Sequence, residues 1–191
     1  MTEEELIKMR SAITGMSRTM STYRFGPHIF LEAEWLLRIY VRPVHVADLT
    51  GIPETRAILM WKEIFEGPTP RGKISESSIK SLITKEDIIH AYLFAYYYAK
   101  EGGEQIKQRV VNRALIAGYL EYLRSIVHPA FSGDKAYRIA RDMCVDPISG
   151  SAALELKHCS RCGAQYLKSY DKITLNVCQF CKIYDIKSDD K

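Results

Sequence analysis

The chain has 191 residues and a formal net charge of +4 at pH 7; 47% of the residues are hydrophobic and 26% are charged. This composition is ordinary for a globular protein and excludes a disordered tail, a collagen-like repeat and a simple coiled coil. The small positive charge permits nucleic-acid binding without requiring it.

Most of the chain is expected to be helical, because apolar residues recur at three- and four-residue steps. In chain order, the predicted helices span residues 6–16, 29–41, 44–50, Glu54–Phe65, 85–100, 104–126 and 134–144. The first of them either packs on the body of the protein or docks on a partner. Thr84 places a hydroxyl at the N-cap position, and Glu86 and Asp87 place acidic side chains in the first turn, which is typical of a capped helix start. The stretch 67–73 contains two prolines and two glycines and is expected to be a loop.

The character of the sequence changes after the turn-rich residues 146–151. Partial alternation of apolar and polar residues over 164–169 and 172–177 predicts two short strands. We therefore expect two domains, residues 1–150 and residues 151–191.

Four of the five cysteines lie near the C-terminus, in a spacing typical of a metal site. Cys159 and Cys162 enclose two residues, fifteen residues follow, and Cys178 and Cys181 repeat the first spacing. A two-residue turn lets two thiolates reach one ion at roughly 2.3 Å, and four thiolates complete a tetrahedral zinc site with no open position. We therefore expect one structural Zn²⁺ per chain, held in a small zinc-ribbon-like module.

Two other interpretations of the cysteines exist: a pair of redox dithiols, or four buried thiols that bind nothing. Both are weaker, because a module of about 40 residues has too little core to fold without a metal or disulfides. No window approaches the roughly 18 consecutive apolar residues of a membrane span. The acidic first residues also do not resemble a signal peptide. We therefore expect a cytoplasmic protein with no membrane association, and in that reducing compartment the cysteines are not expected to form disulfides.

Residues 45–62 have the pattern of a helix-turn-helix. Ala47 is a small residue in the first predicted helix, and Gly51 follows four positions later, at the turn. An inward face on the second helix is predicted from Ala57, Ile58 and Trp61. If the hairpin binds DNA, the N-terminal end of its second helix enters the major groove. The predicted DNA contacts are Thr55, Arg56 and Lys62 on the helix, with Arg71 and Lys73 of the following loop at phosphates.

The same pattern also fits a plain packing hairpin in a helical protein. In that case Arg56 pairs with Glu54 or Glu63 and contacts no base, and the charges of the loop are merely solvated. The sequence contains no Gly-rich phosphate loop, nucleophile elbow or metalloprotease motif, so we expect no enzymatic activity. The fold class predicted is mainly α: a multi-helix body with a helix-turn-helix-like hairpin and a C-terminal four-cysteine module.

Three features together resemble the C subunit of the flagellar master transcriptional activator (the FlhC family). They are the run IPETRAILMWKEI at residues 52–64, the Gly67-Pro68-x-Pro70-x-Gly72 loop and the terminal four-cysteine module. The resemblance covers roughly residues 30–182 and implies a subunit that binds double-stranded promoter DNA together with a small helical D subunit. It also implies recruitment of RNA polymerase, and zinc held by the four cysteines.

The resemblance leaves two alternatives for the target genes. Members of the family activate flagellar genes, and related activators on conjugative elements activate transfer genes. A second class of function is a zinc-ribbon interaction subunit or an RNA-binding subunit of another assembly. The many tyrosines on the two longest predicted helices further predict that the chain without its partner self-associates. The alternative is that these rings fill the core, which we expect for most of them.

Overall fold

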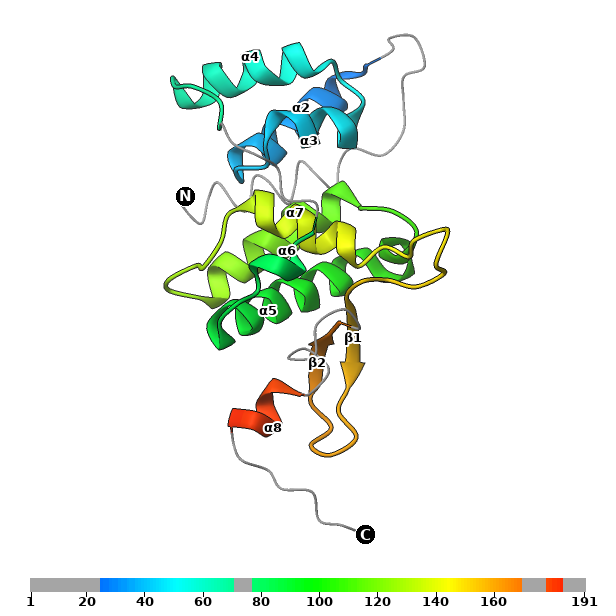
Figure 1. Cartoon of the computed structure of the whole chain (residues 1–191). Helices are drawn as coiled ribbons and strands as arrows, with labels where there is room; N and C mark the ends of the chain where they lie inside the picture. Colours follow the sequence, from blue (N-terminus) through cyan, green and yellow to red (C-terminus); the bar gives the residue numbers. More distant parts are fainter. Residues whose placement is uncertain (1–24, 71–76, 170–177, 184–191) are drawn as a thin grey trace. The chain divides into compact units, whose positions relative to one another are not determined.

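The computed structural model describes residues 25–70, 77–169 and 178–183 (Figure 1). The chain divides into two compact units, Met1–Arg71 and Gly72–Lys191. The second unit contains both the later helices and the cysteine-rich segment, so the domain boundary expected at residue 150 lies inside one unit and stays a prediction. The helix predicted over 6–16 and the strand predicted over 172–177 lie outside the described residues. In the described part of the chain, no helix is long and apolar enough to cross a membrane.

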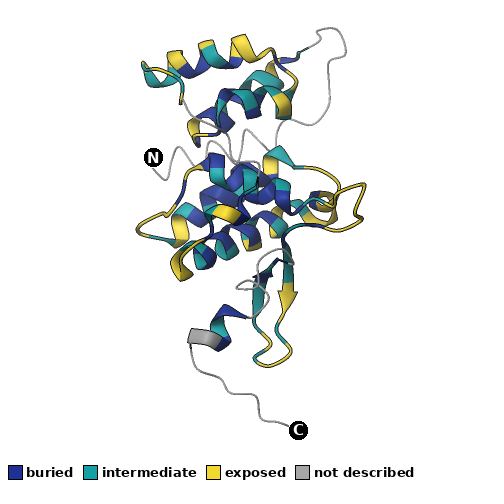
Figure 2. Ribbon diagram, in the orientation of Figure 1, coloured by how far each residue is buried: buried dark blue, intermediate teal, exposed yellow. Residues whose placement is uncertain are grey.

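The first unit contains three helices, all predicted from the sequence: α2 (Pro27–Arg38), α3 (Pro43–Thr50) and α4 (Glu54–Phe65). Helix α2 ends three residues before its predicted end, because Tyr40 adopts a left-handed conformation with φ of 67°. Pro43 then begins α3 and holds the preceding residue in an extended conformation. The three helices share a core that contains Ala33, Leu36, Leu37, Val46, Ala57 and Trp61 (Figure 2).

The second unit begins with a short 3₁₀ turn, η1 (Ile79–Ser81), and continues with α5 (Lys85–Gly102). The predicted capping arrangement at the start of α5 is confirmed. The Thr84 hydroxyl accepts a hydrogen bond from the amide of Asp87, and the Asp87 carboxylate accepts one from the amide of Thr84. This reciprocal pair satisfies two amides that a helix start otherwise leaves without partners.

The prediction of one helix over residues 104–126 was wrong. A 3₁₀ turn, η2 (Gly103–Lys107), is followed by a break, and α6 (Asn112–Ser125) begins only afterwards. Val111 is extended and donates its amide to the Tyr98 hydroxyl at 3.1 Å. Two adjacent valines lose rotamer freedom in a helix, so the tertiary hydrogen bond prevails over a weak local preference.

Helices α5 and α6 pack side by side and form the centre of the second unit. Gly118 makes this close approach possible, because a Cβ atom there would lie 2.8 Å from the backbone of Tyr98. Helix α7 (Gly133–Asp142) packs on both. The aromatic rings between these helices are Phe94, Tyr98, Tyr119, Tyr122 and Phe131, all buried.

The C-terminal part contains a two-stranded antiparallel sheet, β1 (Glu155–His158) and β2 (Gln165–Lys168), and a short helix, α8 (Gln179–Ile183). Strand β2 confirms the strand predicted over 164–169. Strand β1 and helix α8 were not predicted. Both strands pack on α5. The fold is mainly helical with a small two-stranded region, as expected.

Candidate functional site

The four cysteines of the repeated spacing lie together at one end of the small sheet. Cys159 and Cys162 belong to the turn that joins β1 to β2, and Cys178 and Cys181 lie at the start of α8. The turn is closed by the amide of Gly163, which donates to the carbonyl of Cys159 at 2.9 Å. Gly163 has a φ of 71°, a conformation that residues with a side chain rarely adopt. The glycine therefore allows the turn that aims both thiols at one point.

The geometry of the sulfur atoms fits a tetrahedral metal site. All four lie within 4.8 Å of one another, with Cys159 and Cys181 at 3.6 Å and Cys162 and Cys178 at 3.7 Å. Disulfide sulfurs are about 2.05 Å apart, so these are separate thiols. In a tetrahedron with metal–sulfur bonds of about 2.3 Å, the sulfurs are roughly 3.8 Å apart. The four cysteines can therefore hold a metal ion.

The surroundings of the thiols differ, and so do their pKa values. The amides of Cys162 and Arg161 hydrogen-bond the sulfur of Cys159 and lower its pKa to about 6. Burial, followed by the neighbouring thiols, raises the pKa of Cys181 to about 12. Burial also raises the pKa of Cys178. Four thiolates this close together repel one another, so a bound cation is what makes the fully deprotonated cluster favourable.

Two further residues of types that can bind metals, a histidine and the fifth cysteine, lie outside this cluster. His158 is exposed, and its Nδ1 lies 3.3 Å from the carbonyl oxygen of Gly163. Cys144 follows α7 by two residues, and its thiol donates to the carbonyl of Ala140 at 3.5 Å. Burial raises the pKa of the Cys144 thiol, which makes it a poor nucleophile and a poor metal ligand at neutral pH.

The cysteine cluster is attached to the helical body by an aromatic contact that the sequence did not predict. Phe180 lies between Cys178 and Cys181, and its ring meets that of Tyr92 on α5 edge to face at 5.5 Å. Phe180 lies in the short helix α8 together with Cys181, and Cys178 directly precedes that helix. The position of the cluster and the packing on α5 therefore depend on each other.

Helices α3 and α4 form the predicted helical hairpin. Gly51 caps α3 in a left-handed conformation with φ of 77°, and its amide donates to the carbonyl of Ala47 at 2.8 Å. Ala57 and Trp61 face the core as predicted, Ile58 is half-buried, and Met60 is an additional core residue. The opposite face of α4 is exposed and presents Thr55, Leu59 and Lys62.

Arg56 lies near the start of α4, beside α2. Its guanidinium carbon is 5.9 Å from the centre of the Phe30 ring. One guanidinium nitrogen is 4.0 Å from a carboxylate oxygen of Glu63, and 48% of the Arg56 side chain is exposed. Arg71 and Lys73, the predicted phosphate contacts, lie outside the described residues.

Comparison with known proteins identifies the family. Residues 30–188 match the family model described as flagellar transcriptional activator (FlhC). No curated protein matches the chain. The matched region includes the hairpin, the proline- and glycine-containing loop and all four clustered cysteines, which are the features that the sequence resemblance rested on. The chain therefore belongs to the FlhC family of flagellar transcriptional activators, which are not enzymes but subunits of the FlhDC activator that binds promoter DNA.

Proposed function

We propose that this chain is the promoter-contacting subunit of a flagellar transcriptional activator. It acts with a small helical subunit of the FlhD type and recruits RNA polymerase to the promoter. The family match over residues 30–188 is the single observation that supports this most strongly. Within this proposal the cysteine cluster holds a structural metal, and the α3–α4 hairpin contacts DNA.

Zinc is the metal that we propose for the cluster. Four thiolates form a soft donor set, and tetrahedral coordination by four sulfurs is typical of structural zinc. The ligands are Cys159, Cys162, Cys178 and Cys181, whose sulfur atoms lie within 4.8 Å of one another. With four protein ligands no coordination position is left for water or substrate, so the metal fixes the β1–β2 turn against α8 and has no catalytic role.

The N-terminal end of α4 is the part of the hairpin that we place in the major groove. Thr55 is exposed at that end, and Lys62 is exposed further along the same helix. Lys62 lies about two turns along the helix from Thr55, where the DNA backbone passes a recognition helix, and Thr55 is placed to contact a phosphate or a thymine methyl group.

Arg56 is the proposed base contact. Its ion pair with Glu63 is long, at 4.0 Å, and solvent-exposed. Such pairs contribute about 0–1 kcal/mol to stability. A bidentate contact with guanine discriminates by about 1–3 kcal/mol. The Glu63 pair is therefore too weak to hold Arg56 away from DNA.

Arg71 and Lys73 are proposed to contact phosphates from the loop that follows α4. Loss of either charge should weaken binding to all sequences alike and reduce the salt dependence by roughly one phosphate contact. This behaviour separates them from Arg56, whose loss should reduce sequence preference.

The experiment that tests this function measures the affinity of the chain, co-purified with its FlhD-type partner, for a flagellar promoter fragment and for a scrambled fragment at fixed salt. Arg56→Ala should lower the preference for the promoter by roughly 5- to 150-fold, the equivalent of about 1–3 kcal/mol. Arg38→Ala is the matched control, because Arg38 is equally exposed at 48% but is paired with Glu34 on α2. An unaltered protein without promoter preference contradicts the function, and an Arg56→Ala variant with unchanged preference contradicts the assigned base contact.

A further inference from the structure

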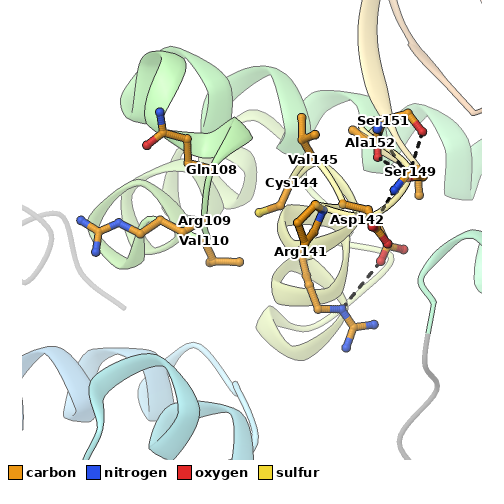
Figure 3. A pocket seen from close by; sticks show the side chains of 13 residues that line it. Gln108, Arg109, Val110, Arg141, Asp142, Cys144, Val145, Ser149, Ser151 and Ala152 are labelled. Carbon is orange, nitrogen blue, oxygen red and sulfur yellow. Dashed lines mark hydrogen bonds and ion pairs between the residues drawn. The ribbon is translucent and has the colours of Figure 1, made fainter.

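The second unit contains a groove that neither the cysteine cluster nor the hairpin uses. Its volume is about 880 Å³. One wall is the break between η2 and α6, and the other is the end of α7 with the loop that follows it (Figure 3). Gln108, Arg109 and Val110 come from the first wall, and Arg141, Cys144, Val145 and Ala152 come from the second. The groove therefore exists because α6 begins late, at Asn112.

The two acidic residues that line the groove are engaged in internal hydrogen bonds. Asp142 is buried, and its Oδ2 accepts from the amide and the hydroxyl of Ser78, each at 2.7 Å. Asp146 accepts from the amides of Ile148 and Ser149, and these two hydrogen bonds lower its pKa. Both carboxylates thus have their acceptor positions largely occupied by the chain itself.

Of the two arginines that line the groove, Arg109 is the candidate to bind an incoming carboxylate. Arg109 is exposed and has no ion-pair partner among the residues that the structure describes. The Nε of Arg141 lies 3.8 Å from Asp142 Oδ1, and Arg141 is already engaged by the chain. An incoming carboxylate would therefore meet, at Arg109, a guanidinium group able to bind it in a bidentate manner.

Apolar surface lies next to these charges. Val110, Pro147, Ala152 and Val145 line the groove, and 38% of Val145 is exposed. Ile148, on the same loop, is 96% exposed. DNA phosphates gain nothing from apolar walls, whereas a protein segment with acidic and apolar side chains gains from both parts of this surface.

We propose that this groove is a docking site for the FlhD-type partner, which inserts a segment carrying a carboxylate beside apolar side chains. The carboxylate pairs with Arg109, and the apolar side chains cover Val110 and Val145. This inference rests on the proposed function, because it takes the protein partner from the family. It adds the surface at which that partner binds.

The test measures the affinity of the full-length chain for the purified FlhD-type subunit by calorimetry. Arg109→Glu and Val145→Asp should each weaken binding at least about tenfold, the equivalent of 1.4 kcal/mol. Arg109→Lys keeps the charge but not the bidentate geometry, so it should recover part of the affinity that Arg109→Glu loses. Arg113→Glu is the matched control, because Arg113 is an exposed arginine at the start of α6 that does not line the groove. It should change the affinity less than threefold. Circular dichroism and melting temperature confirm that each variant folds.

Promoter binding by each variant is measured in parallel, so that failure of the docking site can be distinguished from failure of the proposed function. Unchanged affinity of Arg109→Glu and Val145→Asp for the partner overturns the docking site. If Arg109→Glu lowers the salt dependence of DNA binding and leaves partner binding intact, that result also overturns the docking site and assigns Arg109 to a phosphate. Loss of self-association with intact partner binding would instead assign the groove to a second copy of this chain. Failure of the unaltered complex to prefer promoter DNA overturns the proposed function, while the calorimetry still tests the groove.

Discussion

At the residue scale, the cysteine cluster makes the sharpest prediction. Cys162 pairs with Cys178 at 3.7 Å, and replacing it with serine removes one of the four proposed thiolate ligands. Structural zinc contributes on the order of 10 kcal/mol to the folding of small peptide sites. Cys162→Ser should therefore release the metal and make the segment around β1, β2 and α8 sensitive to protease.

The measurement is elemental analysis of purified protein together with limited proteolysis. Cys144→Ser is the matched control, because Cys144 is a free thiol outside the cluster. The control should keep one zinc per chain, and Cys162→Ser should keep none. Equal zinc content in the two variants, or no zinc in the unaltered protein, would contradict the assignment.

The lowered pKa of Asp87 predicts how the free energy of unfolding depends on pH. Burial raises its pKa, but hydrogen bonds from Thr84 and the ion pair with Lys135 outweigh burial and lower the pKa from 3.8 to about 2. Because the folded-state pKa is lower than the unfolded one, the contribution is fully present above about pH 4 and is lost as the pH falls toward 2. After a discount for solvent screening it amounts to about 1–2 kcal/mol.

Urea unfolding of the unaltered protein and of Asp87→Asn between pH 3 and pH 6 tests this contribution. The difference in unfolding free energy should be constant at the upper end and narrow as the pH falls. A difference that does not depend on pH would show that Asp87 acts through packing and not through its charge.

At the element scale, the contact between α8 and α5 predicts that the cysteine cluster is coupled to the helical body. The rings of Phe180 and Tyr92 meet at 5.5 Å. Edge-to-face pairs contribute about 0.5–1.5 kcal/mol beyond the area that they bury. A double-mutant cycle of Phe180→Ala and Tyr92→Ala should give a coupling energy in that range.

Tyr96 provides the comparison for this cycle. It lies one turn further along α5, is 40% exposed and meets the ring of Tyr92 at 6.3 Å. The coupling between Phe180→Ala and Tyr96→Ala should be close to zero. If the cycles with Tyr92 and Tyr96 give equal values, the edge-to-face contact does not attach α8 to α5.

Elements with strong local patterns were predicted well, and elements that depend on distant partners were not. Helix α4 spans the residues that its apolar spacing predicted, and the capping box at Thr84 was recognised from four consecutive residues. The break before α6 depends on the Tyr98 hydroxyl, 13 residues away, so no local pattern signals it. Strand β1, Glu-Leu-Lys-His, is mostly polar and becomes a strand only through its pairing with β2.

The same division holds for the candidate site. The spacing of the four cysteines predicted which thiols would meet, because each pair is local and one ion requires all four. The ring contact of Phe180 with Tyr92 and the position of Arg56 over Phe30 join residues far apart in the sequence, which spacing does not reveal. The late start of α6 produces the groove beside Arg109, so that surface also was not predictable.

At the scale of the whole molecule, we predict that the isolated chain self-associates, because several large apolar side chains are exposed. The large hydrophobic residues with substantial exposure include Leu59, Val127 and Ile148, at 50%, 88% and 96%. Association that covers these side chains would remove apolar area from water, which is favourable. Light scattering should show self-association of the isolated chain and a defined complex when the FlhD-type partner is added. A monodisperse monomer without the partner would contradict this prediction.

The central claim is that this chain, with its FlhD-type partner, activates transcription from flagellar promoters. Run-off transcription by bacterial RNA polymerase tests it most directly, with a flagellar promoter and the promoter of a conjugative transfer gene as parallel templates. We predict that transcript from the flagellar template rises only when both subunits are present, and that transcript from the transfer template does not. No rise on the flagellar template, or a rise confined to the transfer template, would contradict the claim.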